Sequence, residues 1–278
     1  TDNKLLATGE IDEEEFIQSV VDATTSPGFC NTMGTATTMN SLAEGLGMSL
    51  PGCAAIPAPL SERLEMSYRT GLRIVEMVKK DLTPSKILTR KAFENSIVLN
   101  SAIGGSTNAP IHINAIARHV GVELEIEDWE KVGLEIPMLV NMQPGGKYLG
   151  EDFHRAGGVP AVMNALLKAG KLHDSAITVN GKTVAENYAE TTTQDTDVIR
   201  TFQNPMLENA GFIVLKGNIF DSAVMKTSVI SDSFRSQYLD KPGSKNVFEV
   251  RAIVFEGPED YRKRINDPQL NINVDCIL

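Results

Sequence analysis

The sequence has few cysteines, no long apolar run and no excess of basic residues, and each absence excludes a class of protein. Its three cysteines, Cys30, Cys53 and Cys276, are too few and too far apart for a disulfide scaffold. They are consistent with a reducing compartment, which predicts a cytoplasmic protein. No apolar stretch approaches the ~20 residues of a transmembrane helix, and the first residues lack the pattern of a signal peptide. The formal charge of −10 argues against nucleic-acid and membrane partners.

Several common catalytic and metal-binding motifs are also missing. No two cysteines have C-x-x-C spacing, and the four histidines have no metal-binding spacing. The Pro-Gly-Gly of residues 144–146 is not followed by the Lys-Ser/Thr of a phosphate-binding loop, and G-x-S-x-G does not occur. The chain therefore encodes no self-contained zinc or iron–sulfur site, no P-loop and no hydrolase nucleophile elbow.

What is present is ordinary globular composition, with 42% hydrophobic and 22% charged residues over 278 positions. Helix-like and strand-like segments alternate, which predicts an α/β fold. Helices are expected at 13–23, 35–47, 61–80, 90–102, 110–120 and 158–170, and a buried strand at 136–142. After residue 203 strands are expected to dominate, at 211–220, 222–230, 246–257 and 271–278.

Local signals support several of these elements. Asp12 and Glu15 form a variant of the capping box, and Pro110 suits a first helical turn. Gly170 is expected to end its helix, and Asn180-Gly181 to form a tight turn. In the segment 61–80, the apolar residues Leu64, Tyr68, Leu72 and Val75 have the four, four and three spacing of an amphipathic helix.

The polar, threonine-rich segment 190–205 is a candidate linker, so a domain boundary is predicted near residue 203. This divides the chain into domains at 1–203 and 204–278. The chain begins with Thr1 rather than Met, and its last eight residues resemble a strand that continues. An exposed apolar strand is an unfavourable place for a natural chain to stop, so a fragment is expected.

Cys30 lies in a loop bounded by glycines, directly before a predicted helix. Free N–H groups and the helix dipole would favour a thiolate there, which suits a nucleophile or a ligand of a metal or cluster. The alternative is a small buried side chain, the commoner role of a lone cysteine. Cys53 has no helix directly after it and is interpreted as structural, and Cys276 as part of the core.

A second candidate site is Gly104-Gly-Ser-Thr-Asn108. Its two glycines allow a ligand close to the backbone, and Ser106, Thr107 and Asn108 offer hydrogen bonds at a helix start. The alternative is a helix cap after a tight turn. His112, one turn further, could face the same site, but a partly buried helix histidine is the favoured interpretation.

Four segments in order, residues 26–52, 98–122, 151–166 and 204–228, resemble the IlvD/Edd dehydratase family. That family contains dihydroxy-acid, phosphogluconate and sugar-acid dehydratases, and the resemblance covers nearly the whole chain. The run FCNTMGTATTMN and the following PGCAAIPAP are most similar to the pentonate branch, the arabinonate and xylonate dehydratases.

The resemblance implies a doubly wound N-terminal α/β domain, incomplete here, followed by the start of a β-rich barrel. It implies removal of water from a 2,3-dihydroxy acid to give a 2-keto-3-deoxy acid. An iron–sulfur cluster and Mg²⁺ would be the cofactors, with the iron as Lewis acid for the leaving hydroxyl. A two-iron cluster is favoured for the pentonate branch, with a four-iron cluster as the alternative.

When the resemblance is carried over residue by residue, Cys30 matches the third of the family's three cluster cysteines. The other two have no match, and no Cys-Asp-Lys motif is present to supply Mg²⁺ ligands. The family's catalytic serine and Mg²⁺ glutamate would lie beyond Leu278, so this chain alone is expected to be inactive.

The resemblance also implies a homo-oligomer that acts on a small sugar acid. One alternative is a dihydroxy-acid dehydratase of branched-chain amino-acid synthesis. From other classes, the alternatives are a non-catalytic module that binds anions at residues 104–108 and an inert fragment kept only as part of a subunit interface.

Overall fold

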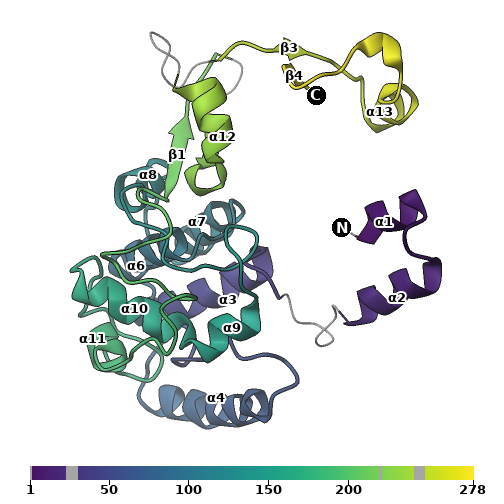
Figure 1. Cartoon of the computed structure of the whole chain (residues 1–278). Helices are drawn as coiled ribbons and strands as arrows, with labels where there is room; N and C mark the ends of the chain where they lie inside the picture. Colours follow the sequence, from purple (N-terminus) through teal and green to yellow (C-terminus); the bar gives the residue numbers. More distant parts are fainter. Residues whose placement is uncertain (1, 23–30, 219–220, 241–247) are drawn as a thin grey trace. The chain divides into compact units, whose positions relative to one another are not determined.

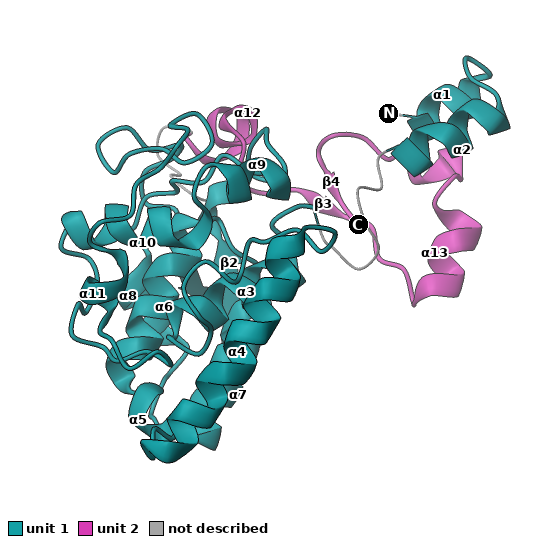
Figure 2. Ribbon diagram, turned by 90° about the horizontal axis from the view of Figure 1, so that it is seen from below, with its two compact units in different colours: residues 1–229 teal, residues 230–278 magenta. Residues whose placement is uncertain are grey.

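The computed structural model describes residues 2–22, 31–218, 221–240 and 248–278. The chain divides into two compact units, residues 1–229 and 230–278 (Figure 2). Helices dominate both, and the described residues form four short strands, so the structure is a helix-rich α/β mixture (Figure 1). A unit defined by contacts does not fix a domain boundary, and the boundary near residue 203 stays a prediction.

The first unit contains eleven described α-helices and one pair of strands. The helices are α1 (Asp2–Thr8), α2 (Glu13–Asp22), α3 (Thr35–Gly45), α4 (Ser61–Lys79), α5 (Pro84–Ile87), α6 (Arg90–Ala102), α7 (Ala109–His119), α8 (Glu127–Gly133), α9 (Gly150–Arg155), α10 (Gly158–Lys168) and α11 (Val184–Tyr188). The strands are β1 (Phe212–Leu215) and β2 (Ala223–Lys226), followed by a 3-10 turn at Thr227–Val229.

The local signals at helix ends are confirmed. The Asp12 amide donates to Glu15 Oε2 at 3.1 Å and the Glu15 amide donates to Asp12 Oδ1 at 2.8 Å, which completes the capping box. Pro110 stands in the first turn of α7. Gly170, with φ of 67°, lies just after α10. Gly181, with φ of 81°, forms the tight turn whose flanks join where Thr178 N donates to Lys182 O at 2.9 Å.

Helix α6 forms the centre of the core. Phe93, Ile97 and Leu99 are fully buried, and α3, α8, α10 and α7 all contact the helix. The buried polar side chain Asn95 is paired, because its amide donates to His173 O at 3.0 Å and its Oδ1 accepts from His173 N at 2.7 Å. Such pairing is what makes a polar group tolerable in a core.

The hairpin β1–β2 is attached to this core by aromatic packing. The strands are antiparallel, with Phe212 opposite Lys226. The Phe212 ring stacks on Trp129 of α8 with centroids 5.8 Å apart, and Trp129 is 1% exposed. Gly211 has no room for a side chain, since a Cβ there would lie 2.1 Å from Gly133 O. These contacts explain why the first unit extends past residue 203.

The predicted strand at 136–142 is wrong, although its burial is confirmed. Its backbone forms only isolated bridges, of Met138 with Leu207 and Val140 with Ile199 among them. The Leu139 amide donates instead to Ala102 O at 2.7 Å. The apolar run reflects a buried segment whose amides pair with several different segments rather than with one neighbouring strand.

The second unit contains α12 (Asp232–Phe234), a π-helical turn at Arg235–Leu239, β3 (Arg251–Ala252), α13 (Pro258–Arg264), a 3-10 turn at Pro268–Leu270 and β4 (Cys276–Ile277). The strands β3 and β4 pair in parallel over two residues each. The expected dominance of strands after residue 203 is therefore wrong for the described residues. Cys276 is half-buried in a two-residue strand rather than part of a core.

The helix predicted at 61–80 is confirmed as α4, but its predicted apolar face is exposed. Leu64 is 76% exposed, Tyr68 68%, Leu72 56% and Val75 52%. Met66 and Met77, on the opposite side, are the buried residues of this helix. Neither α4 nor any other helix among the described residues has the length and apolar character needed to span a bilayer.

Candidate active site

The segment 104–108 lies against the first turn of α3. This turn begins at Thr35, a few positions after Cys30 in the sequence. Ser106 Oγ is 3.1 Å from Thr35 Oγ1, and the Ser106 amide donates to Thr38 Oγ1 at 3.0 Å. Asn108 Nδ2 donates to Thr35 Oγ1 at 2.8 Å. These contacts join positions about seventy residues apart in the chain. They place residues 104–108 against Thr35, which follows Cys30 by five positions.

The same contacts bear on the alternative of a simple helix cap. The side chain of Asn108, the residue before α7, makes no capping hydrogen bond to its own helix, since its amide is bonded to Thr35 of α3. Ser106 Oγ accepts from the Asn108 amide at 3.1 Å, which is a local turn. The polar side chains thus tie the start of α7 to the start of α3. Two helix N-termini meet here, although the first turn of α7 is already largely satisfied, because Pro110 has no N–H and the Ala109 amide donates to Ser106 O at 3.1 Å.

Gly105 allows this close packing. A Cβ at this position would lie 2.0 Å from Asn100 Oδ1 and 3.0 Å from the Thr38 methyl carbon, so only glycine fits without a shift. Asn100 is 1% exposed and its Oδ1 has no hydrogen-bond partner among the described residues. A buried carbonyl oxygen without a donor is unfavourable and is available to a ligand or to water.

The loop around residues 141–150 fixes the residues that follow Cys30. Asn31 O and Asn31 Oδ1 both accept from the Gly150 amide, at 2.9 Å each. The Met33 amide donates to Gln143 O at 2.7 Å. The loop is itself braced by Asn141 Oδ1, which accepts from the Lys147 amide at 2.9 Å. The position of the chain immediately after Cys30 is therefore set by α9 and this loop.

Lys226 is a residue of this site that the sequence analysis missed. It ends β2, is 9% exposed, and its Nζ donates to Gly104 O at 2.5 Å, directly beside Gly105. Burial lowers the pKa of its ammonium group. The sequence offered one signal for Lys226, a single lysine at the end of the otherwise apolar strand Ala-Val-Met-Lys. Only the packing of β2 on the core shows that its side chain reaches residue 104.

The predicted site residues have different outcomes. Ser106 is half-buried at the junction, whereas Thr107 and Asn108 are exposed. Cys30 lies outside the described residues. His112 is exposed on α7, so the expected partial burial is wrong. The roles assigned to Cys30, Ser106, Thr107 and Asn108 remain predictions.

Glu44, also missed, is the most buried carboxyl group near this region. It is 1% exposed on α3, and it accepts from the amides of Gly52 at 2.7 Å and Ala54 at 2.9 Å. Burial raises its pKa to about 7, against the opposing effect of these two hydrogen bonds. Cys53 lies between them, and burial raises the pKa of its thiol, which disfavours the reactive thiolate.

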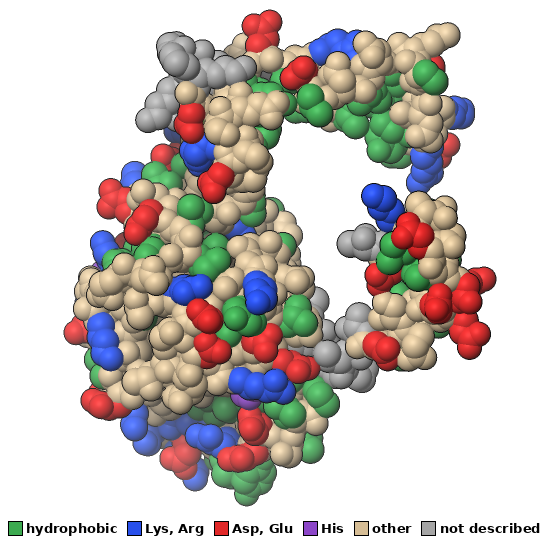
Figure 3. All heavy atoms as spheres, in the orientation of Figure 1, with side chains coloured by type: hydrophobic (Ala, Val, Ile, Leu, Met, Phe, Trp, Pro, Cys, Tyr) green, Lys and Arg blue, Asp and Glu red, His purple; other side chains and the backbone are tan. Residues whose placement is uncertain are grey.

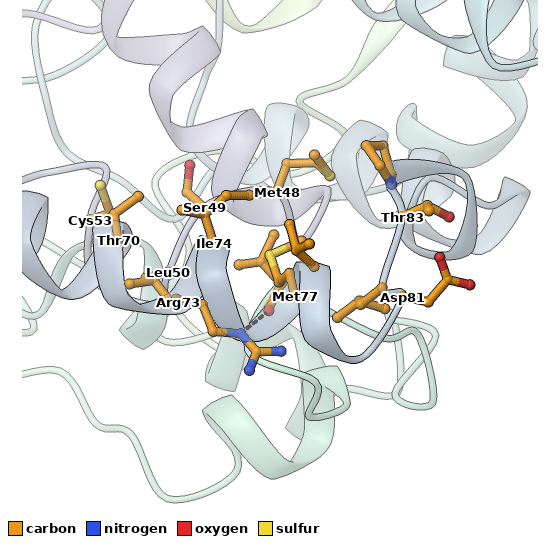
Figure 4. A pocket seen from close by; sticks show the side chains of 14 residues that line it. Met48, Ser49, Leu50, Cys53, Thr70, Arg73, Ile74, Met77, Asp81 and Thr83 are labelled. Atoms are coloured by element: carbon orange, nitrogen blue, oxygen red, sulfur yellow. Dashed lines mark hydrogen bonds between the residues drawn. The ribbon is translucent and has the colours of Figure 1, made fainter.

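A separate groove of about 490 Å³ lies between α4 and the loops near residues 48–53 and 81–84 (Figure 4). It is lined mainly by apolar side chains such as Leu50, Met77 and Leu82. Arg73 spans it, with Nε donating to Val179 O at 2.5 Å, while its buried Nη2 has no partner among the described residues. None of the residues at 104–108 lines this groove.

The described residues do not by themselves fit an iron–sulfur cluster or a Mg²⁺ ion. No three His, Cys, Asp or Glu side chains of these ranges gather where they could bind a metal ion. The thiols of Cys53 and Cys276 are both free. Cys53 contacts Arg63, which suits a structural role. Cys30 lies outside the described residues and stays a predicted cluster ligand.

Comparison with known proteins gives matches over almost the whole chain. The family model for the N-terminal part of dihydroxy-acid/6-phosphogluconate dehydratases matches residues 2–187, and the model for the C-terminal part matches residues 197–278. D-xylonate dehydratase of Caulobacter vibrioides is 58% identical over 98% of this chain and 46% of its own length. L-arabinonate dehydratase of Rhizobium leguminosarum is 45% identical over 99% of the chain and 46% of its length.

More distant relatives include dihydroxy-acid dehydratase of Caldanaerobacter subterraneus, 43% identical over 90% of this chain and 45% of its own length. The chain thus spans about half the length of the curated relatives it matches. Two family models together account for almost all of its residues, and the matched segments include both candidate site segments. The chain belongs to the dihydroxy-acid/6-phosphogluconate dehydratase family.

Proposed function

We propose that this chain is part of a hydro-lyase that removes water from a sugar acid, converting a 2,3-dihydroxy acid to a 2-keto-3-deoxy acid. The observation that carries the proposal is the 58% identity to a D-xylonate dehydratase along 98% of the chain. Identity to dihydroxy-acid dehydratases is lower, at 43%. A pentonate is therefore the favoured substrate class, and a branched-chain dihydroxy acid is the alternative.

The arrangement of the candidate site supports an anionic substrate. The N-termini of α3 and α7 converge at Ser106, and the positive dipole ends of two helices favour a carboxylate. The ammonium group of Lys226 lies behind the same loop at Gly104. Ser106, Thr107 and Asn108 are the proposed substrate-contacting residues, since hydroxyl and amide groups suit the hydroxyls of a sugar acid.

For the whole enzyme we propose an iron–sulfur cluster, with two irons favoured over four, and Mg²⁺ as cofactors. Cys30 would supply one thiolate. The next residue, Asn31, accepts a hydrogen bond from the Gly150 amide. The remaining cluster ligands, the Mg²⁺ ligands and the catalytic serine would come from residues outside this chain. The corresponding architecture is a doubly wound domain followed by a β-rich barrel. A homo-oligomer is proposed with it from the family resemblance, and a cytoplasmic location from the three separated cysteines.

The test is an assay of the full-length protein on three substrates, D-xylonate, L-arabinonate and a branched 2,3-dihydroxy acid, with Mg²⁺ and after anaerobic iron–sulfur reconstitution. The expected result is a kcat/KM at least about tenfold higher on a pentonate than on the branched acid. A preference for the branched acid would favour the alternative substrate. Anion binding without turnover and without an iron requirement would show a binding module instead.

A further inference from the structure

The buried ammonium group of Lys226 has no opposite charge beside it. Figure 3 shows lysine and arginine side chains at the surface, the usual place for such charges, whereas Lys226 is 9% exposed. Among the residues that the structure describes, no carboxylate forms an ion pair with it, and burial is the cause of its lowered pKa. Burying a charge without a counter-charge costs free energy, and functional sites are where proteins tolerate that cost.

The hairpin holds the backbone of Lys226 firmly against the core. Lys226 lies opposite Phe212, whose ring is stacked on Trp129 of α8. In the next residue of the chain, Thr227 Oγ1 donates to Gly211 O at 2.7 Å. Because these contacts fix the base of the lysine side chain, its Nζ atom can hold another segment in place.

That other segment is the peptide unit between Gly104 and Gly105. Its carbonyl oxygen accepts from Lys226 Nζ at 2.5 Å, and its N–H, the Gly105 amide, donates to Asn100 O at 2.8 Å. Both ends of one peptide dipole are therefore bonded, and a charged donor at one end strengthens the hydrogen bond at the other. A Cβ at Gly104 would lie 2.7 Å from Met138 Sδ, so the peptide is closely packed as well.

The residues after this peptide leave one exposed amide open to a ligand. The Ser106 amide donates to Thr38 Oγ1, and the Asn108 amide donates to Ser106 Oγ. The Thr107 amide has no hydrogen-bond partner among the described residues, and Thr107 is exposed. A carboxylate could accept a hydrogen bond there, and the ammonium group behind Gly104 favours a negative charge at this surface.

We propose that Lys226 is a positioning residue, which holds the Gly104 carbonyl so that the exposed Thr107 amide receives the carboxylate of the acid substrate. In this role Lys226 acts through Gly104 rather than by contact with the substrate. Bound substrate then supplies the negative charge that the ammonium group lacks among the described residues. The inference rests on the proposed function, because it takes a sugar acid as the substrate.

The first experiment measures the kinetics of variants of the full-length enzyme on its preferred pentonate. Lys226→Met is expected to raise KM about tenfold or more and to change kcat less than about threefold, because the carboxylate is bound equally in the ground and transition states. Lys226→Gln should give an intermediate KM, since a neutral amide is a weaker donor. Lys226→Arg keeps a charged donor and should stay within about threefold of wild type.

The matched control is Lys216→Met. Lys216 directly follows β1 in the same hairpin, but its side chain is 64% exposed and its Nζ lies 2.9 Å from Glu127 Oε1. The same substitution there removes a charge without touching the loop, so wild-type KM is expected. Circular dichroism verifies that the helical content of each variant is unchanged, and Lys226→Gln provides the comparison if Lys226→Met does not fold.

The second experiment needs no turnover and measures hydrogen exchange in peptides that cover residues 100–108. The amides of Gly105 and Ser106 should exchange at least about tenfold faster in Lys226→Met than in wild type, and at the wild-type rate in Lys216→Met. Unchanged exchange in Lys226→Met would overturn the inference. So would a wild-type KM in Lys226→Met, or equal KM values for the Met, Gln and Arg variants. A wild-type enzyme inactive on all three acids would instead refute the proposed function, and the exchange rates would still test whether Lys226 holds the loop.

Discussion

Ser106 Oγ and Thr35 Oγ1 lie 3.1 Å apart, although 71 positions separate them in the chain. Thr35 also accepts from Asn108 Nδ2, so one threonine at the start of α3 connects two of the three polar residues of the 104–108 loop. The segment after Cys30 and the glycine pair thereby become parts of one site.

Removal of the Ser106 hydroxyl is expected to lower activity more than stability. In the full-length enzyme, Ser106→Ala should reduce kcat/KM on a pentonate by about tenfold or more, because the hydroxyl orients the loop and faces the proposed substrate. The free energy of unfolding should fall by only about 1 kcal/mol, the net value of a typical hydrogen bond. Ser85→Ala is the control, since Ser85 Oγ pairs similarly with Thr83 Oγ1 at 3.0 Å. Equal kcat/KM for wild type and Ser106→Ala would contradict the assignment.

Cys30 is expected to be the cysteine that holds the cluster. In the full-length enzyme, Cys30→Ser should abolish both the iron absorbance and turnover, because a serine hydroxyl does not replace a thiolate as a cluster ligand. Cys53→Ser and Cys276→Ser should keep the iron. The measurement is iron and sulfide content with the visible spectrum of each purified variant. A Cys30→Ser enzyme with wild-type iron content would exclude the assignment.

Gly105 is expected to tolerate no side chain while Asn100 is present. Gly105→Ala places a methyl group 2.0 Å from Asn100 Oδ1, so we expect a loss of about 1–3 kcal/mol in the free energy of unfolding. The double variant Gly105→Ala/Asn100→Ala should recover part of that loss, because it removes the clashing oxygen. Urea denaturation measures both. Additive effects of the two substitutions would show that this contact is not the cause.

Glu44 is expected to make the protein less stable as pH rises from 5 to 8. Its folded-state pKa of about 7 lies above the ordinary 4.5, so folding favours the protonated form. The stabilisation is complete below pH 4.5 and is lost as pH rises through 7, by about 3 kcal/mol in total. Glu44→Gln should remove this dependence, measured as the free energy of unfolding in urea at several pH values.

The control for Glu44 is Glu186→Gln. Glu186 Oε2 also accepts a backbone amide, from Thr183 at 2.7 Å, but the group is exposed and this bond lowers its pKa. The stabilisation that ionised Glu186 provides is present above its ordinary pKa and is lost only at lower pH. Glu186→Gln should therefore leave the pH dependence of the unfolding free energy between pH 5 and 8 unchanged. If the free energy of unfolding of Glu44→Gln depends on pH as it does in wild type, another group causes the pH dependence.

The sequence by itself determined the elements whose causes are local. The Asp12–Glu15 capping box, Pro110 in the first turn of α7 and the turn at Asn180-Gly181 involve partners within four positions. Such interactions depend little on the remainder of the fold, so residue types at fixed spacing predict them. Family membership was likewise carried by the sequence, through ordered segments that the family models match.

Only the tertiary structure decided which distant groups meet. The sequence could not show that Lys226 reaches Gly104 or that Thr35 joins Ser106 to Asn108, since these contacts depend on how α3, α7 and β2 pack. It also predicted a strand at 136–142 from its apolar residues. These residues are buried because the segment packs among several others, not because it is a strand of a sheet. For α4 the amphipathic spacing predicted the helix but not which face is covered, because burial depends on the neighbours that packing supplies.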